Sequence, residues 1–278
     1  MAEWLRRGLQ ILARRFDSGR GLQTSGLRAR QASKNLPLSW RSGRFGRLSE
    51  GGRALRAGEK MTVDFQEMRV KMVDGQVRTT DVTDTPILNA MLEMPREEFV
   101  PAGLRPLAYM DDDIALGAGR FMMRPSPFAR LVQLCGVRVG DLVLDVGCGS
   151  GYSSAILARI AGFVVALESE AELAAAAGKA LAAVGCENVS VVEGPLPAGH
   201  AAQAPYDAIV VEGAVDAISP ALIEQLKEGG RLVAVVGEGN TGRATLWLKE
   251  GGLVSSRPVF NAAVPMFEAF RREPVFRF

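Results

Sequence analysis

The stretch DLVLDVGCGSG, residues 141–151, decides the fold of this 278-residue chain. The mostly apolar residues 142–146 predict a buried strand, and the apolar stretch that starts at Tyr152 predicts a helix. Between them glycine stands at every second position (147, 149 and 151), which lets the backbone pass close under a ligand. Because the helix offers unpaired N–H groups at its start, the segment predicts a nucleotide-type pocket at the end of a parallel strand.

Strands and helices are predicted to alternate from this segment onward. Continuous apolar runs such as residues 208–211 indicate strands buried on both faces, as in parallel sheets. After Gly237 the pattern changes, and residues 244–260 predict two strands joined in a hairpin at Glu250-Gly251-Gly252. The expected strands are 142–146, 163–168, 189–193, 207–212 and 231–236, and the expected helices are 152–161, 170–184 and 219–227.

The region before the sheet is predicted to be helical. Residues 63–77 carry apolar side chains at helical spacing. Thr85-Pro86 and Ser126-Pro127 each combine a capping hydroxyl with a proline at the first helical position, which predicts two further helix starts. Since these helices have no room inside a parallel sheet, we expect them to form a cover beside it. The expected regions are thus a basic extension (1–60), a helical and substrate-side region (61–140) and a nucleotide-binding domain (141–278).

Charge separates the N-terminal extension from the rest of the chain. Residues 1–60 hold 14 Lys or Arg and four Asp or Glu, whereas residues 61–278 hold 19 and 27. The extension has too few apolar groups to offset its ordering entropy, so we expect it to be disordered. It has the composition of an organelle transit peptide or of a basic arm for nucleic acid or anionic lipid, or it has no folded role and Met61 is the working start.

Cysteine and histidine usage excludes several classes of site. The three cysteines form no CxxC pair, which argues against a zinc site or a disulfide framework and favours a reducing compartment. The single histidine, His200, argues against histidine-dependent triads and multi-histidine metal sites. No stretch reaches the ~18 apolar residues of a membrane span. We therefore expect no metal and no membrane partner.

Acidic residues are predicted at the ends of four strands. Glu168 ends the second strand, where a carboxylate accepts hydrogen bonds from both ribose hydroxyls; the alternative is a solvated charge. Acids at four neighbouring strand ends would form a negatively charged rim at one edge of the sheet. This acidic rim repels a pyrophosphate and favours a cationic cofactor without phosphate, such as S-adenosyl-L-methionine. The expected cofactor-binding residues are Asp145, Gly147, Cys148, Gly149, Gly151, Glu168, Glu193, Gly194 and Glu212.

The segment LVLDVGCGSGYSSAILARIAG, residues 142–162, resembles the cofactor motif of class I methyltransferases. More narrowly, residues 69–278 are similar to the protein-L-isoaspartate O-methyltransferase family. The resemblance implies an α/β, Rossmann-like fold with a mostly parallel sheet, a C-terminal antiparallel hairpin and an N-terminal helical cover. It also implies a cytoplasmic repair enzyme that methylates the carboxylate of isoaspartyl residues in damaged proteins. The motifs that carry it include Arg69-x-x-Met72-Val73-x-x-Gln76, Pro95-Arg96-Glu97-x-Phe99-Val100-Pro101, Ala108-Tyr109, residues 204–214 and 225–237, and Val264-Pro265.

One segment departs from the family pattern. Where the family has a GQTISQP-like stretch, this chain has GRFMMRP (119–125), which places Met123 at the position of a hydroxyl that helps to hold the substrate carboxylate. A thioether does not donate hydrogen bonds, so Arg120 and Arg124 are candidates to bind a carboxylate in its place. The alternatives are a methyltransferase redirected to another protein or a small molecule, and a cofactor-binding homologue without catalysis.

The implied reaction needs little acid–base help. A carboxylate, with a reference pKa near ~4, is already ionised and nucleophilic at neutral pH. No general base is required, which suits a chain with one histidine. Two features argue against nucleic acid as the acceptor. The core is acidic, and Glu212-Gly-Ala-Val stands at the end of the fourth strand instead of an NPPY-like loop.

Overall fold

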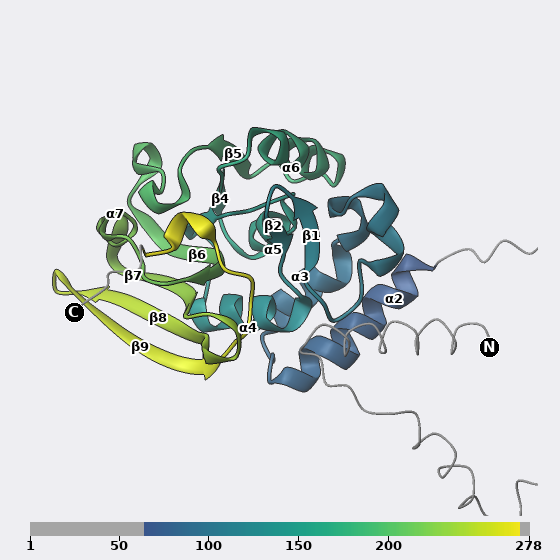
Figure 1. Ribbon diagram of the computed structural model, residues 1–278, viewed down its shortest axis with the longest axis horizontal. Coiled ribbons are helices and arrows are strands. Elements are labelled where there is room, and N and C mark those ends of the chain that lie inside the picture. Colours follow the sequence, from purple (N-terminus) through teal and green to yellow (C-terminus); the bar gives the residue numbers. More distant parts are fainter. Residues whose placement is uncertain (1–63, 273–278) are drawn as a thin grey trace, which may run out of the picture. The chain divides into compact units, whose positions relative to one another are not determined.

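The computed structural model describes residues 64–272, which form an α/β domain around one seven-stranded sheet (Figure 1). The strand order is β5-β4-β3-β6-β7-β8-β9, parallel from β5 to β7 and antiparallel from β7 to β9. The strands are β3 (Leu142–Val146), β4 (Phe163–Glu168), β5 (Val189–Glu193), β6 (Tyr206–Val215), β7 (Leu226–Val236), β8 (Arg243–Glu250) and β9 (Leu253–Asn261). This confirms the expected fold class and its terminal hairpin.

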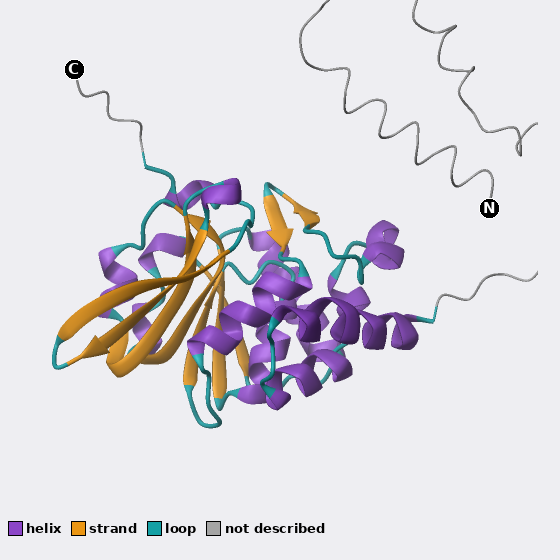
Figure 2. Ribbon diagram, turned by 90° about the horizontal axis from the view of Figure 1, so that it is seen from below, coloured by secondary structure: helices purple, strands orange, loops and turns teal. Residues whose placement is uncertain are grey.

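The remaining elements cover the sheet or stand beside it. The helices are α2 (Phe65–Met72), α3 (Thr85–Glu93), α4 (Pro125–Cys135), α5 (Tyr152–Ile160), α6 (Ala171–Ala183) and α7 (Pro220–Glu224). A separate two-stranded hairpin joins β1 (Ile114–Gly117) to β2 (Arg120–Met122). Figure 2 shows this small hairpin apart from the main sheet. α2 lies at the side of the domain away from the β8–β9 hairpin (Figure 1), and α3 packs against α2, α4 and α5.

Side chains of the central strands point alternately into two hydrophobic cores. Val143 of β3 faces the core under the N-terminal helices, α4, α5 and α6, while Leu144 and Val146 face the opposite core. The second core is closed by α7 and by Phe267 and Phe270 from the C-terminal segment. Because both faces are buried, the central strands read as continuous apolar runs.

Some predicted element boundaries are wrong, for local reasons. Asp84, rather than Thr85, caps α3, because its carboxylate accepts a hydrogen bond from Ile87 N at 3.2 Å. α4 begins at Pro125, before the predicted Ser126 cap, and has no side-chain cap. α7 ends at Glu224 because Leu226 already pairs with Tyr206 of β6.

Residues of the N-terminal motifs hold the cover together. The Arg69 guanidinium donates to Tyr109 Oη at 2.9 Å and pairs with Glu97 at 3.2 Å. Gln76 Nε2 donates to the Tyr109 carbonyl at 2.9 Å. Arg96, fully buried, donates to the carbonyls of Ala108 and Met123, each at 2.8 Å. These contacts position the segment that leads into β1 and β2.

The basic extension, residues 1–60, lies outside the described residues, and so do the predictions made for it. Among residues 64–272, no helix combines the length and apolar character needed to cross a bilayer.

Candidate active site

The glycine loop after β3 adopts the backbone geometry that its sequence predicts. Gly147, Gly149 and Gly151 have φ angles of 83°, 56° and 95°, in the left-handed region that disfavours side chains. A β-carbon on Gly147 would lie 2.6 Å from Arg120 Nη2 and from the Phe267 ring, and one on Gly149 would lie 2.7 Å from Leu116. Glycine is therefore required here both for conformation and for close approach.

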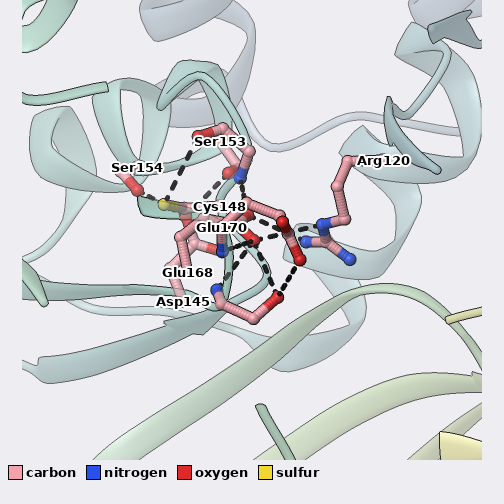
Figure 3. A network of polar contacts seen from close by, with 9 residues as sticks. Arg120, Asp145, Cys148, Ser153, Ser154, Glu168 and Glu170 are labelled. Atoms are coloured by element: carbon pink, nitrogen blue, oxygen red, sulfur yellow. Dashed lines mark hydrogen bonds and ion pairs between the residues drawn. The ribbon is translucent and has the colours of Figure 1, made fainter. Parts of the chain in front are cut away.

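The Glu168 carboxylate, fully buried at the end of β4, is the centre of a polar network (Figure 3). It accepts hydrogen bonds from the backbone N–H groups of Gly149 (2.7 Å), Ser169 (2.8 Å) and Glu170 (3.2 Å). Ser169 Oγ donates a further bond at 3.2 Å. The predicted acid thus lies against the predicted loop, and the solvated alternative is wrong for Glu168.

Arg120 of β2 completes this network and was not expected there. Its Nε and Nη2 donate to the two Glu168 oxygens at 3.1 Å and 2.9 Å, and its guanidinium stacks on the Phe267 ring at 4.0 Å. The Arg120 side chain is only 8% exposed. Arg120 therefore lies at the Glu168 carboxylate rather than free for a substrate carboxylate, and it neutralises one charge of the predicted acidic rim.

Asp145 supports the loop from below. Its Oδ2 accepts from the hydroxyls of Ser153 and Ser154, both at 2.6 Å, at the start of α5. Burial raises the Asp145 pKa, the two hydroxyls oppose that rise, and the nearby Glu168 charge adds to it. Asp145 thus fixes the strand, loop and helix relative to one another, while its Oδ1 has no hydrogen-bond partner.

A small cavity lies beside the loop. Its volume of about 10 Å³ is the size of one water molecule. Met123 belongs to its wall and is buried. The other lining residues are Phe121, Met122, Phe128, Gly147, Cys148, Ser150, Tyr152, Ser153 and Glu212.

Burial opposes ionisation of the side chains that line this cavity. Burial raises the pKa of Glu212 well above its usual value, and the neighbouring Asp145 adds to the rise. Burial likewise raises the pKa of the Cys148 thiol and of the Tyr152 phenol. Burial therefore disfavours negative charge on Glu212 at this edge of the sheet.

The remaining predicted residues lie apart from this cavity. Glu193 ends β5 in register with Glu168 and is exposed, and Gly194 N donates to the Glu168 carbonyl at 3.0 Å. The Arg124 guanidinium donates to the Ala263 carbonyl at 2.8 Å and pairs with Asp113 at 3.4 Å. Arg124 thus braces the C-terminal segment.

Three features of the site were missed in the sequence. Phe267 reaches the loop because the C-terminal segment bridges back to β6, where Ala214 pairs with Met266. No local pattern marks that return. The Arg120–Glu168 pair joins residues 48 positions apart. The serines on Asp145 were detectable, since two hydroxyl residues open a helix directly after a glycine loop.

Comparison with known proteins identifies the relatives of this chain. The family model described as protein-L-isoaspartate(D-aspartate) O-methyltransferase matches residues 67–266. A protein-L-isoaspartate O-methyltransferase of Koribacter versatilis is 43% identical over 61% of this chain and 76% of its own length. One of Methanoculleus marisnigri is 37% identical over 73% of this chain and 92% of its own.

Solved structures show the same architecture. A protein-L-isoaspartate O-methyltransferase, 27% identical, superposes with a TM-score of 0.63 over 72% of this chain and 65% of its own. A Plasmodium falciparum protein described as a putative member of that family, in complex with S-adenosyl-L-homocysteine, shares the fold at 18% identity. Its TM-score is 0.63, over 75% of this chain and 100% of its own.

Proposed function

Because this chain belongs to the protein-L-isoaspartate(D-aspartate) O-methyltransferase family and uses S-adenosylmethionine, we propose that Glu168 and the glycine loop hold that cofactor. The single observation that carries the proposal is the Glu168 carboxylate, buried at a strand end and oriented by three backbone N–H groups. A carboxylate fixed in this way is suited to accept hydrogen bonds from ribose hydroxyls.

The residues around Glu168 fit such a cofactor if the side chains beside the glycine loop change rotamer. Arg120 occupies both Glu168 oxygens, and the ends of Arg120, Phe267 and Leu116 fill the space beside the loop glycines. These are side chains rather than backbone, so the space opens when they change rotamer. In our proposal Arg120 releases Glu168 when the cofactor binds, and Glu193 and Gly194 lie at the next strand end to contact the base.

The methyl acceptor in the proposal is a damaged protein that carries an isoaspartyl residue. S-adenosylmethionine supplies the methyl group. The chain's own residues supply position and exclude water, since the acceptor carboxylate is ionised without a base. Favourable positioning contributes on the order of 7–11 kcal/mol to such reactions. Met123, Phe128 and Tyr152 form the apolar part of the wall that excludes water.

Two roles expected from the sequence are assigned differently in this proposal. Arg120 is a partner of the cofactor acid and Arg124 a brace of the C-terminal segment, so neither holds the acceptor carboxylate. Met123 contributes apolar surface only. The proposal includes no nucleic-acid acceptor, and it leaves the compartment and the role of residues 1–60 as predictions.

Calorimetry with S-adenosylhomocysteine tests the cofactor assignment without turnover. We expect Glu168→Gln to weaken binding at least tenfold, because the amide replaces one acceptor oxygen by a donor. The matched control is Glu172→Gln, an exposed glutamate on α6. Equal affinity of both variants and the unmodified protein would place the ribose elsewhere. A melting curve of each variant reports whether the fold is intact.

A further inference from the structure

A buried polar atom without a partner lies beside the loop. Glu212 is 7% exposed, lines the cavity, and its Oε1 has no hydrogen-bond partner among the described residues. A buried polar atom left unpaired costs about 1–3 kcal/mol. Nothing in the protein alone offsets this cost. A ligand that forms a hydrogen bond with Glu212 would therefore gain binding free energy.

The surroundings of Glu212 determine what it offers to a ligand. Asp145 on β3 raises the cost of ionising Glu212, and Arg120 on β2 and Arg96 before β1 oppose that effect. Cys148 and Tyr152, which share the cavity, stay protonated. Burial outweighs the two arginines. Because Glu212 is buried and forms no ion pair among the described residues, its protonated form is favoured, and that form has an O–H to donate.

The other side chains that line the cavity provide few free hydrogen-bond donors for an anion. The Ser153 hydroxyl already donates to Asp145, and the Ser150 hydroxyl donates to the Phe99 carbonyl at 2.5 Å. Met123 has no donor. The Tyr152 hydroxyl also has no partner, so it is the second available donor in this wall.

We propose that the buried, unpaired Glu212 carboxyl group donates a hydrogen bond to the carboxylate of the methyl acceptor and so favours acceptors that carry an isoaspartyl residue. A neutral acid binds a carboxylate without the repulsion that an ionised glutamate would exert. Because the acceptor carboxylate is charged, this hydrogen bond is charge-assisted. It replaces the hydrogen bond to the acceptor carboxylate that the Met123 thioether does not donate. This inference rests on the proposed function, because it presupposes an isoaspartyl acceptor.

Access to Glu212 requires movement of the β1–β2 hairpin. The cavity has the size of one water molecule, and a carboxylate needs more room. Phe121, Met122 and Met123 in its wall belong to β2 or follow it directly. Arg120 of the same strand is bound to Glu168. If the cofactor displaces Arg120 from Glu168, the hairpin residues that line the cavity would be able to move.

Two substitutions at Glu212 distinguish the effect of its hydrogen-bond donor from the effect of its charge. Glu212→Gln keeps a donor and does not ionise, whereas Glu212→Leu keeps the volume and loses the donor. With an isoaspartyl peptide we expect kcat/KM to stay within about threefold for Glu212→Gln. For Glu212→Leu we expect a fall of about 10- to 100-fold, mostly in KM, as for one hydrogen bond to a charged group. Glu172→Gln is the exposed control.

A pH profile adds a readout that a structural role would not change. In the unmodified protein kcat/KM should fall at alkaline pH as Glu212 ionises and repels the acceptor. This alkaline fall should be absent in Glu212→Gln. The profile needs no Leu variant, so the inference stays testable if Glu212→Leu does not fold.

The competing role is an ionised Glu212 that faces the cofactor sulfonium. In that case Glu212→Gln would weaken S-adenosylmethionine, a cation, far more than the neutral S-adenosylhomocysteine. That result, or an unchanged kcat/KM in Glu212→Leu, overturns the inference while the cofactor assignment to Glu168 stands. No methylation of the isoaspartyl peptide by the unmodified protein refutes instead the proposed function on which the inference rests.

Discussion

Replacing Arg120 by methionine should make the protein less stable and its cofactor affinity higher. Met keeps an unbranched apolar stem against Phe267 but removes both bonds to Glu168. Breaking a buried ion pair by removing one partner costs roughly 3–5 kcal/mol. We expect the lower end, about 3 kcal/mol, since Glu168 keeps its backbone donors and one serine hydroxyl.

The affinity gain follows from the competition for Glu168. In the unmodified protein, ribose hydroxyls must replace hydrogen bonds to a charged guanidinium, each of which contributes about 1.5–3 kcal/mol. Since about 1.4 kcal/mol corresponds to a tenfold change, Arg120→Met should bind S-adenosylhomocysteine about 10- to 100-fold more tightly. Calorimetry measures this affinity, and chemical denaturation measures the stability. The control is Arg105→Met, which removes an exposed ion pair with Glu98 and should change neither quantity by more than a small amount.

A double-mutant cycle with Glu168→Gln decides between competition and cooperation. If Arg120 only competes, its removal should have no effect on affinity once Glu168 no longer accepts from the ribose. A tenfold or greater loss of affinity in Arg120→Met alone would refute this reasoning, because Arg120 would then belong to the cofactor-bound site.

Three further changes probe the scaffold of the site. Gly147→Ala should lower both stability, by about 1–3 kcal/mol, and S-adenosylhomocysteine affinity, because its φ of 83° is strained for alanine and Phe267 lies in the way; denaturation and calorimetry check both. Arg96→Met should lower the free energy of unfolding by about 2–4 kcal/mol, because two buried carbonyls lose their donor; an unchanged denaturation midpoint would contradict this. Because folding raises the pKa of Glu212, the cost of ionising it in the folded protein is absent below the unfolded pKa of about 4 and lowers stability as pH rises toward the folded pKa. Glu212→Gln should therefore gain stability over the unmodified protein at pH 8 but not at pH 4, as measured by urea denaturation at both.

The sequence was sufficient to predict the strands and helices around the loop. β3, β4 and β5 agree residue for residue with the expected strands, because each is a short apolar run bounded by glycine or a polar residue. β6 and β7 are longer than predicted. Leu226 pairs with Tyr206, and Ala214 contacts the returning C-terminal segment, so tertiary pairing extends both strands.

The placement of the acids was predictable, but their state was not. Parallel strands end at one edge, so Asp145, Glu168 and Glu212 necessarily gather there. Their effective charge depends on distant residues. Arg120 neutralises Glu168 across 48 positions, and burial raises the pKa of Glu212. Periodicity and strand ends carry no information on either effect.

Methyl transfer to a matched pair of peptides decides whether this protein methylates isoaspartyl residues. The two peptides should differ only in carrying an isoaspartyl or an aspartyl residue, with labelled S-adenosylmethionine as donor and the full chain as enzyme. We expect label on the isoaspartyl peptide and none above background on its aspartyl twin. Equal labelling of both peptides, or none on either while S-adenosylhomocysteine still binds, would contradict this expectation.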